Sequence, residues 1–413
     1  MLSTGLFHPG RQHSWQVAAA LKSAGALRWY ATSIYYDPRR FPYRLASALP
    51  GKLGRNVGSQ LARRATDLVD ANDVRHLPAL EWSELLAARA GIRQAAAALN
   101  RAGNGIFQRS VARLLAKESV DRLWGFDTSC AWLFEHPLAR NSVRILDQTA
   151  GYAGKVREIL LRQREEYPEY FSQLDVPSAS AVAEADREIA AASHILVGAR
   201  QGVDCLLDRG IDPARVHLLP FGYHEQRFPR QFPERDGLGH LPVRFLFVGA
   251  VNARKGIHLL LRAFQRFSAD QAHLTLVGPL GMAKELLRSR HGNVEYVAAL
   301  PHDRIVTEYE KAHCFLFPTL IDGGGIVLYE AAAAGLGIIQ SANCGDGVRE
   351  GRLGANGRIV AENTVEAWQA ALESVIANPA ILRDWSAASW AMREERTWTA
   401  YRQRIVELLP KLV

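Results

Sequence analysis

Short apolar runs recur along the chain, and most are followed by a segment in which apolar positions return every three or four residues. Short buried runs that alternate with amphipathic helices are typical of parallel sheets covered by helices on both faces. The runs form two series, at 2–7, 27–35, 121–126, 142–146, 194–197 and 216–219, and then at 244–248, 273–277, 293–297, 315–317 and 338–340. We therefore expect an α/β chain with two doubly wound, Rossmann-like domains that face a central cleft.

Two stretches interrupt this alternation. Residues 37–117 show several helical patterns without a clear strand, which predicts a helical insertion in the first domain. Residues 220–242 are rich in Pro and Gly and have no periodicity, which is typical of an interdomain linker. The expected helices are 15–23, 152–170, 179–192, 256–267, 284–290, 303–311, 326–334, 364–377, 381–393 and 397–409. The expected domains are 1–222, 223–394 and a terminal helical segment, 395–413, that packs back on the first domain.

One unit of the second series has a turn with more glycine than a connection between strand and helix requires. The strand 315–317 is followed by Asp322, by Gly323, Gly324 and Gly325, and by a helix that begins at Ile326. Glycines let a backbone approach a ligand closely, and a helix N-terminus offers unpaired N–H groups and a positive dipole end. The pattern favours a phosphate-binding turn. The alternative is a tight turn in which Asp322 caps a buried helix.

A second loop of this kind lies between the strand 244–248 and the helix that follows it. It contains Gly249 and, where the helix begins, Arg254 and Lys255. Two cations beside a helix N-terminus favour a diphosphate over a monophosphate. A third loop with glycines, 343–350, also follows a strand, and three such loops on one sheet indicate a nucleotide-type site.

The first domain also has candidate ligand contacts directly after its strands. The loop after the first strand contains Gly10, Arg11 and His13, and Asp127 follows the strand 121–126. Loops at the carboxyl ends of parallel strands are where doubly wound sheets bind ligands, so we expect these residues to line the same cleft. The alternative for His13 is a structural histidine.

Composition places the chain among globular proteins with large cores. With 413 residues, of which 48% are hydrophobic, it is long enough for two domains. No apolar run approaches the roughly 18–20 residues needed to cross a bilayer, and the start lacks the apolar segment of a signal peptide. The four cysteines are far apart, so we expect neither disulfides nor a zinc site, and a reducing, cytoplasmic location.

The positive charge is concentrated in one part of the chain. Residues 37–117 contain fourteen Lys and Arg against six Asp and Glu, an excess as large as the net charge of the whole chain, +8. Basic residues interleaved with apolar ones suit anionic lipid headgroups or a phosphorylated acceptor. The alternative is an ordinary solvated helical face. The chain contains no recognisable nucleic-acid-binding module, so we do not expect a nucleic-acid partner.

An ordered series of motifs resembles a known enzyme family. The motifs are EADREIAAASHILVGARQGVDCLL, HLLPFGYHEQRF, VGAVNARKGIHLLLRAF, LTLVGP, FPTLIDGGGIVLYEAAAAGLGII and GANGRIV. They resemble retaining GT-B glycosyltransferases of family 4 over nearly all of residues 180–410, and HPGRQHSWQVAAALKSAG resembles the family's first loop more weakly. The resemblance implies a GT-B fold in which the second domain binds a nucleotide-sugar donor and the first binds the acceptor. It also implies transfer without a metal or other cofactor.

The resemblance implies roles for individual residues. Lys255 matches the lysine that binds the donor phosphates, and Glu330 matches the second acid of the EX7E motif, which accepts hydrogen bonds from the ribose hydroxyls. Asp322 occupies the place of the first acid, which contacts the sugar, and Arg254 adds a cation for the leaving diphosphate. The other residues expected on the donor side are Gly10, Gly249, Gly323, Gly324, Gly325 and Ile326.

The chain also departs from the family pattern. Ala250 stands where the family has Arg, and Asp322 is one methylene shorter than the usual Glu. The histidine that many relatives carry after the fourth or fifth strand is missing, and Asp127 or His13 is the candidate for its space.

We expect a metal-independent, retaining transfer of a sugar from a nucleotide diphosphate sugar to a glycan or lipid-linked acceptor, in polysaccharide or glycolipid assembly. The expected location is cytoplasmic, with peripheral contact to the anionic inner membrane face. The alternatives are a sugar-nucleotide epimerase or hydrolase of the same fold, and an inactive sugar-nucleotide-binding subunit, for which Ala250 and Asp322 are the reason.

Overall fold

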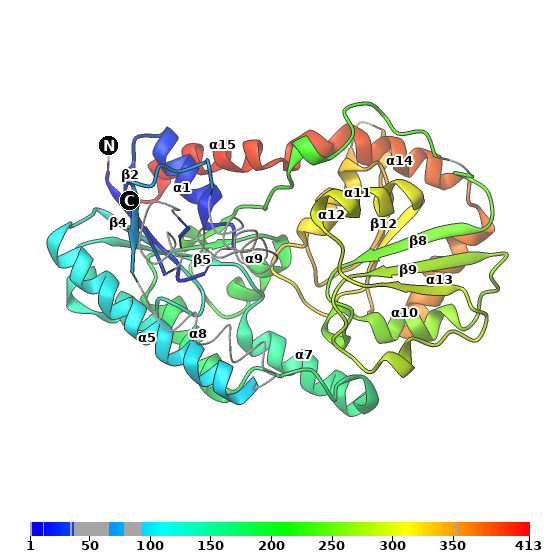
Figure 1. The fold of residues 1–413 in the computed structure, drawn as a ribbon, viewed down its shortest axis with the longest axis horizontal. Helices are drawn as coiled ribbons and strands as arrows, with labels where there is room; N and C mark the ends of the chain where they lie inside the picture. Colours follow the sequence, from blue (N-terminus) through cyan, green and yellow to red (C-terminus); the bar gives the residue numbers. More distant parts are fainter. Residues whose placement is uncertain are drawn as a thin grey trace, which may run out of the picture.

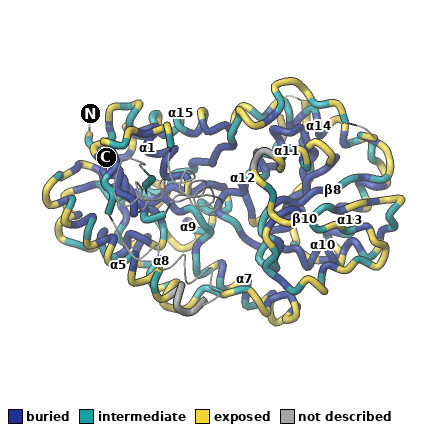
Figure 2. The backbone as a smooth tube through the Cα atoms, in the orientation of Figure 1, coloured by how far each residue is buried: buried dark blue, intermediate teal, exposed yellow. Residues whose placement is uncertain are grey.

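The computed structural model describes residues 2–10, 12–33, 35–36, 66–77, 93–235, 237–351 and 353–413. Two parallel sheets lie side by side along the long axis of the molecule, each with helices on its faces (Figure 1). The two sheets form the buried centre of each half, and the exposed residues lie mainly on the outer helices and loops (Figure 2). The expectation of two doubly wound domains is confirmed.

The first sheet has the strand order β3-β2-β1-β4-β5-β6-β7, and all of its pairings are parallel. Its strands are β1 Thr4–Phe7, β2 Leu27–Thr32, β3 Val74–His76, β4 Arg122–Phe126, β5 Val143–Gln148, β6 His194–Val197 and β7 Val216–Leu218. The expectation that 37–117 contains no strand is wrong, because β3 lies within it and pairs with Tyr30–Thr32. With three residues, of which only Val74 is buried, β3 leaves no apolar run in the sequence.

The helices of the first half are α1 Ser14–Ser23, α5 Arg93–Lys117, α6 Ala131–Glu135, α7 Ala153–Glu166, α8 Ala179–Ala191 and α9 Arg200–Leu207. The 3₁₀ turn Pro168–Tyr170 follows α7. Here α7 extends toward the second domain (Figure 1), where the rings of Tyr167, Tyr170 and Phe171 surround His258. This contact joins the two domains by apolar packing.

The second sheet has the strand order β10-β9-β8-β11-β12-β15. Its strands are β8 Val243–Val248, β9 Ala272–Val277, β10 Val294–Val297, β11 Cys314–Phe317, β12 Gly337–Ser341 and β15 Gly357–Val360. A small antiparallel hairpin pairs β13 Glu350–Gly351 with β14 Gly354–Ala355. The sequence did not predict β15, an edge strand in which Arg358 and Ile359 are exposed.

The helices of the second half are α10 Ile257–Phe264, α11 His302–Lys311, α12 Ile326–Ala333, α13 Val365–Ala377, α14 Ile381–Met392 and α15 Trp398–Leu408. The expected helix at 284–290 is wrong: this stretch forms only the 3₁₀ turn Lys284–Leu287. Of its residues only Leu287 is buried, so it lacks the apolar stripe that stabilises a helix by packing.

The last helix, α15, crosses back to the first half and packs on α1 (Figure 1). Buried Arg122 of β4 anchors the chain after α15, because its Nε donates to the Leu412 carbonyl at 2.7 Å and its Nη2 to the Leu409 carbonyl at 2.8 Å. Trp398 and Tyr401 of α15 reach the ring of His13, and this aromatic contact holds α15 on the first domain.

Candidate functional site

Each sheet reverses its strand order once, and ligands of doubly wound sheets bind at the carboxyl ends of the strands beside that reversal. In the second sheet β8 and β11 meet at the reversal, which brings the loops 249–256 and 318–325 together. In the first sheet β1 and β4 meet, beside the loops 8–13 and 127–130. All four loops contain residues that the sequence singled out.

The glycine turn makes a close contact between the two domains. A Cβ atom on Gly323 would lie 1.9 Å from the carbonyl oxygen of Thr149, which follows β5 in the first domain. A Cβ atom on Gly324 would overlap the ring of Phe221. Gly325 has a φ of +57° and is the N-cap of α12, so Asp322 does not cap this helix. These glycines therefore let the domains approach, and Ile326 follows as the first residue of α12.

Asp322 instead pairs with the cations of the neighbouring loop. Lys255 Nζ donates to Asp322 Oδ2 at 2.5 Å, and Arg254 Nη2 lies 3.9 Å from Asp322 Oδ1. Burial alone would raise the pKa of Asp322, but Lys255 and Arg254 outweigh burial and hold this pKa below its ordinary value. The loop is held by Asn252, whose side chain accepts from the Lys255 N–H, and by Gly256, which has a φ of +70°. The structure thus brings the predicted cations and the first acid into one cluster.

The second acid is held by a tyrosine that the sequence did not indicate. Tyr309 Oη donates to Glu330 Oε2 at 2.9 Å, and burial raises the pKa of Glu330 above its ordinary value. Gly249 has a φ of +149°, and its carbonyl packs so closely on Gly278 that no side chain fits there. The glycine at position 278 therefore lets the loops after β8 and β9 pack closely.

Two acids, half-buried Asp127 and buried Glu188, shape the facing edge of the first domain. Asp127 accepts from Thr149 Oγ1 at 2.6 Å and from the Ala150 N–H at 3.0 Å, and burial raises its pKa. Glu188 of α8 accepts from the Thr128 N–H at 2.9 Å and the Cys130 N–H at 3.0 Å, and burial raises its pKa to about 7. Sequence reasoning missed Glu188, because a charged residue in an amphipathic helix is normally exposed.

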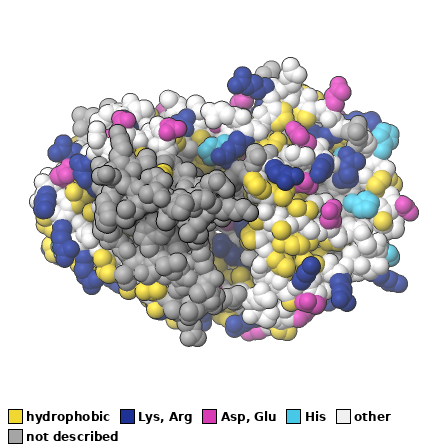
Figure 3. Space-filling model, in the orientation of Figure 1, with side chains coloured by type: hydrophobic (Ala, Val, Ile, Leu, Met, Phe, Trp, Pro, Cys, Tyr) yellow, Lys and Arg dark blue, Asp and Glu magenta, His cyan; other side chains and the backbone are white. Residues whose placement is uncertain are grey.

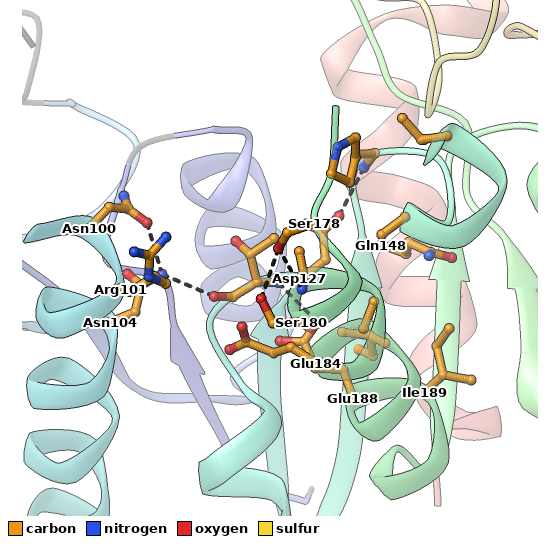
Figure 4. Close-up of a pocket in the computed structure, with 18 of the residues that line it drawn as sticks. Asn100, Arg101, Asn104, Asp127, Gln148, Ser178, Ser180, Glu184, Glu188 and Ile189 are labelled. Carbon is orange, nitrogen blue, oxygen red and sulfur yellow. Dashed lines mark hydrogen bonds between the residues drawn. The ribbon is translucent and has the colours of Figure 1, made fainter. Parts of the chain in front are cut away.

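A cavity of about 780 Å³ opens beside these acids. Its walls come from α5, α8 and the loops after β4 and β5, and Arg254 of the second domain completes it. In Figure 4, Asn100, Arg101 and Asn104 of α5 face Ser180 and Glu184 of α8, with Asp127 between the two helices. A volume of this size suits a ligand of a few sugar rings.

No described residue of the loop after β1 lines this cavity. His13 is buried, with its Nε2 3.2 Å from Asp147 Oδ2, and it lies outside the lining of this cavity. Burial lowers the pKa of neighbouring His8 to about 4. Gly10 lies against the His8 ring, and Arg11 lies outside the described residues.

Among the described residues, no three His, Cys, Asp or Glu side chains are grouped so that they could hold a metal ion. No described helix combines the length and apolarity needed to cross a membrane.

Residues 232–390, which include the turn and the cations, match the family model for glycosyl transferases group 1. The D-inositol 3-phosphate glycosyltransferase of Rhodococcus opacus (strain B4) is 28% identical over 246 residues, which are 54% of this chain and 54% of that protein. The matched stretches span between 30% and 58% of the length of the curated relatives.

The fold extends the likeness to the whole chain. Sucrose-phosphate synthase from Thermosynechococcus elongatus superposes with a TM-score of 0.63 at 17% identity, covering 100% of this chain and 99% of that one. Anabaena Alr3699/HepE, solved in complex with UDP-glucose, superposes with a TM-score of 0.58 at 10% identity, covering 99% and 100%. The architecture is therefore that of GT-B glycosyltransferases, as expected.

Proposed function

We propose that the protein is a retaining glycosyltransferase that moves a sugar from a nucleotide diphosphate sugar to an acceptor hydroxyl, in polysaccharide or glycolipid assembly. One observation carries the proposal: Lys255 and Arg254 meet the glycine turn at the reversal of the second sheet, and Arg254 also lines a cavity in the first domain. Such a cation pair provides a place for a diphosphate on one side and for an acceptor on the other. The match to glycosyl transferases group 1 supports the same reaction class.

On the donor side, the diphosphate displaces the Asp322 carboxylate as the partner of Lys255, and Asp322 then turns to the sugar. Glu330, half-buried and held by Tyr309, accepts from the ribose hydroxyls. The fold shared with Alr3699/HepE, which was solved with UDP-glucose, supports this donor class.

In the reaction, the bond between the anomeric carbon and the diphosphate oxygen breaks, and its electron pair stays on the diphosphate. On the same face, the acceptor oxygen bonds to the anomeric carbon and passes its proton to the departing diphosphate oxygen. Lys255, Arg254 and the N–H groups of the glycine turn stabilise the charge that develops on the diphosphate. Because these groups already supply positive charge, we propose that no metal ion is needed.

The acceptor enters the cavity of the first domain, where Asp127 lies beside the loop that contacts Gly323. We propose a glycan or lipid-linked acceptor that is met at an anionic membrane surface through the basic segment 37–117. Figure 3 shows Lys and Arg side chains along the left edge of the first domain, where α5 of this segment lies in Figure 1.

The test is transfer of a labelled sugar by the wild type and by Lys255→Ala and Glu330→Gln. We expect each substitution to reduce transfer by about 100-fold or more while thermal unfolding changes little. Unchanged transfer in either variant contradicts the assignment. Release of free or epimerised sugar without acceptor would indicate the hydrolase or epimerase, and donor binding without any product would indicate an inactive binding subunit.

A further inference from the structure

The face that α5 presents to the cavity has a composition that sugar transfer by itself does not require. Asn100, Asn104 and Gln108 form one stripe along the helix, and Arg101, Gly105 and Arg109 form the next, and all six line the cavity. Residues four apart lie on the same side of a helix. The wall therefore has a row of amide side chains beside a second row, in which Gly105 leaves a gap between two arginines.

The gap at Gly105 is not required by packing. Gly105 lies within the 25-residue helix α5, where glycine costs about 1 kcal/mol relative to alanine. A Cβ atom there would meet only the Arg109 guanidinium, at 3.4 Å, which is an ordinary contact. The glycine thus leaves open space between two arginines whose Cα atoms are about 12 Å apart along the helix.

Both arginines are available to a ligand. Neither has a carboxylate partner within the described part of the chain, and Arg109 lies 5.8 Å from the ring centre of Trp132, which also lines the cavity. Two acids of the cavity already have backbone partners: Asp127 accepts from the Ala150 N–H, and Glu188 accepts from two backbone N–H groups. Glu184 is the other carboxylate of the lining, on α8 across the cavity (Figure 4).

We propose that this face binds a phosphate group carried by the acceptor, held over Gly105 between Arg101 and Arg109, while Asn100 and Asn104 contact hydroxyls of the attached sugar. One guanidinium group can donate two parallel hydrogen bonds to two oxygens of a phosphate. The oxygens of a phosphate point in several directions, so a single phosphate accepts from two forks that approach from opposite sides. The inference rests on the proposed function and names its acceptor as a phosphate-bearing sugar or polyol, free in solution or as a lipid headgroup.

Calorimetry with glucose 6-phosphate, and with glucose as the neutral control, tests the free form. We expect the wild type to bind the phosphate at least ten-fold more tightly than glucose, and Arg101→Gln/Arg109→Gln to lose this preference. Arg113→Gln, which changes an exposed arginine of α5 outside the cavity lining, is the matched control and keeps it. Gly105→Leu fills the gap and also loses the preference, while its thermal stability stays equal or rises because Leu favours the helix.

Vesicles of phosphatidylcholine with and without phosphatidylinositol test the lipid-borne form. Binding that depends on both phosphatidylinositol and the two arginines supports a lipid headgroup, and binding of glucose 6-phosphate supports a soluble acceptor. No arginine-dependent binding of either probe overturns the proposal. So does binding that is lost in Lys255→Ala and kept in Arg101→Gln/Arg109→Gln, because the anion is then at the donor site. UDP binding by the double variant, measured in parallel, tests the donor site separately.

Discussion

Replacement of Gly323 by Ala should separate donor binding from transfer. The new Cβ atom would lie 1.9 Å from the Thr149 carbonyl oxygen, whereas a carbon and an oxygen in contact need about 3.3 Å. The turn and the loop after β5 must therefore move apart by about 1.4 Å. The backbone of the turn fixes the position of the Cβ atom, and the Thr149 oxygen belongs to the backbone. The movement is therefore shared by the two domains rather than taken up by a side chain.

The expected loss of turnover follows from this displacement. Overpacking of this kind costs about 1–3 kcal/mol, which disfavours the arrangement of the domains in which the turn contacts Thr149. A misplacement of about 1 Å between reacting groups lowers turnover by about 100-fold. Lys255 and Arg254, the cations proposed to hold the diphosphate, belong to the same domain as Gly323 and are not moved relative to it.

The assay compares donor affinity with turnover in wild type and Gly323→Ala. We expect the dissociation constant of the nucleotide sugar to change by less than about three-fold, and kcat to fall by about 30- to 100-fold. Thermal unfolding checks that both domains remain folded. Unchanged kcat would show that the approach of the turn to Thr149 has no part in transfer, and loss of donor binding would show that the glycine serves the donor site instead.

Three further predictions concern titration, the second acid and the basic segment. Because burial raises the pKa of Glu188 to about 7, the native state keeps this proton to higher pH than the unfolded chain, so the stabilising contribution is complete below about pH 4.5 and is lost as pH rises through 7. Thermal unfolding of Glu188→Gln should lack this slope, and parallel pH curves for the two proteins would contradict it. Tyr309→Phe removes the hydrogen bond to Glu330 and should weaken nucleotide-sugar binding by about three- to ten-fold, measured by calorimetry, and equal affinity would refute the role of the pair. If 37–117 meets anionic lipid, cosedimentation with anionic vesicles should decline as salt rises, and binding without salt dependence would count against it.

The sequence predicted most of the fold because most strands are short apolar runs buried on both faces, as in Cys314–Phe317. It failed where burial depends on neighbours. β3 has one buried residue, and β15 is an edge strand with Ile359 exposed, so neither has an apolar pattern. The stretch 284–290 has helix-forming residues, but only Leu287 is buried.

The candidate site likewise has features that the sequence predicts and contacts that it does not. The glycine turn and the Arg254–Lys255 loop are local features, and the sequence suffices to identify them. The contacts of Glu188 with the backbone of Cys130, and of Gly323 with Thr149, join segments that are distant in the chain. No spacing rule in one sequence reveals such contacts, since the first depends on how α8 packs on its own sheet and the second on how the two domains meet.

The central claim is that Lys255 and the glycine turn form a nucleotide diphosphate site, and calorimetric titration of UDP, with GDP and ADP in parallel, tests it most directly. Lys255→Ala is compared with Lys284→Ala, which removes an exposed lysine of the same domain. In buffer with EDTA, the wild type and Lys284→Ala should bind at least one of the nucleotides, and Lys255→Ala should bind it about 100-fold more weakly. Equal affinity in Lys255→Ala, or no binding of any of the three nucleotides by the wild type, would contradict the claim.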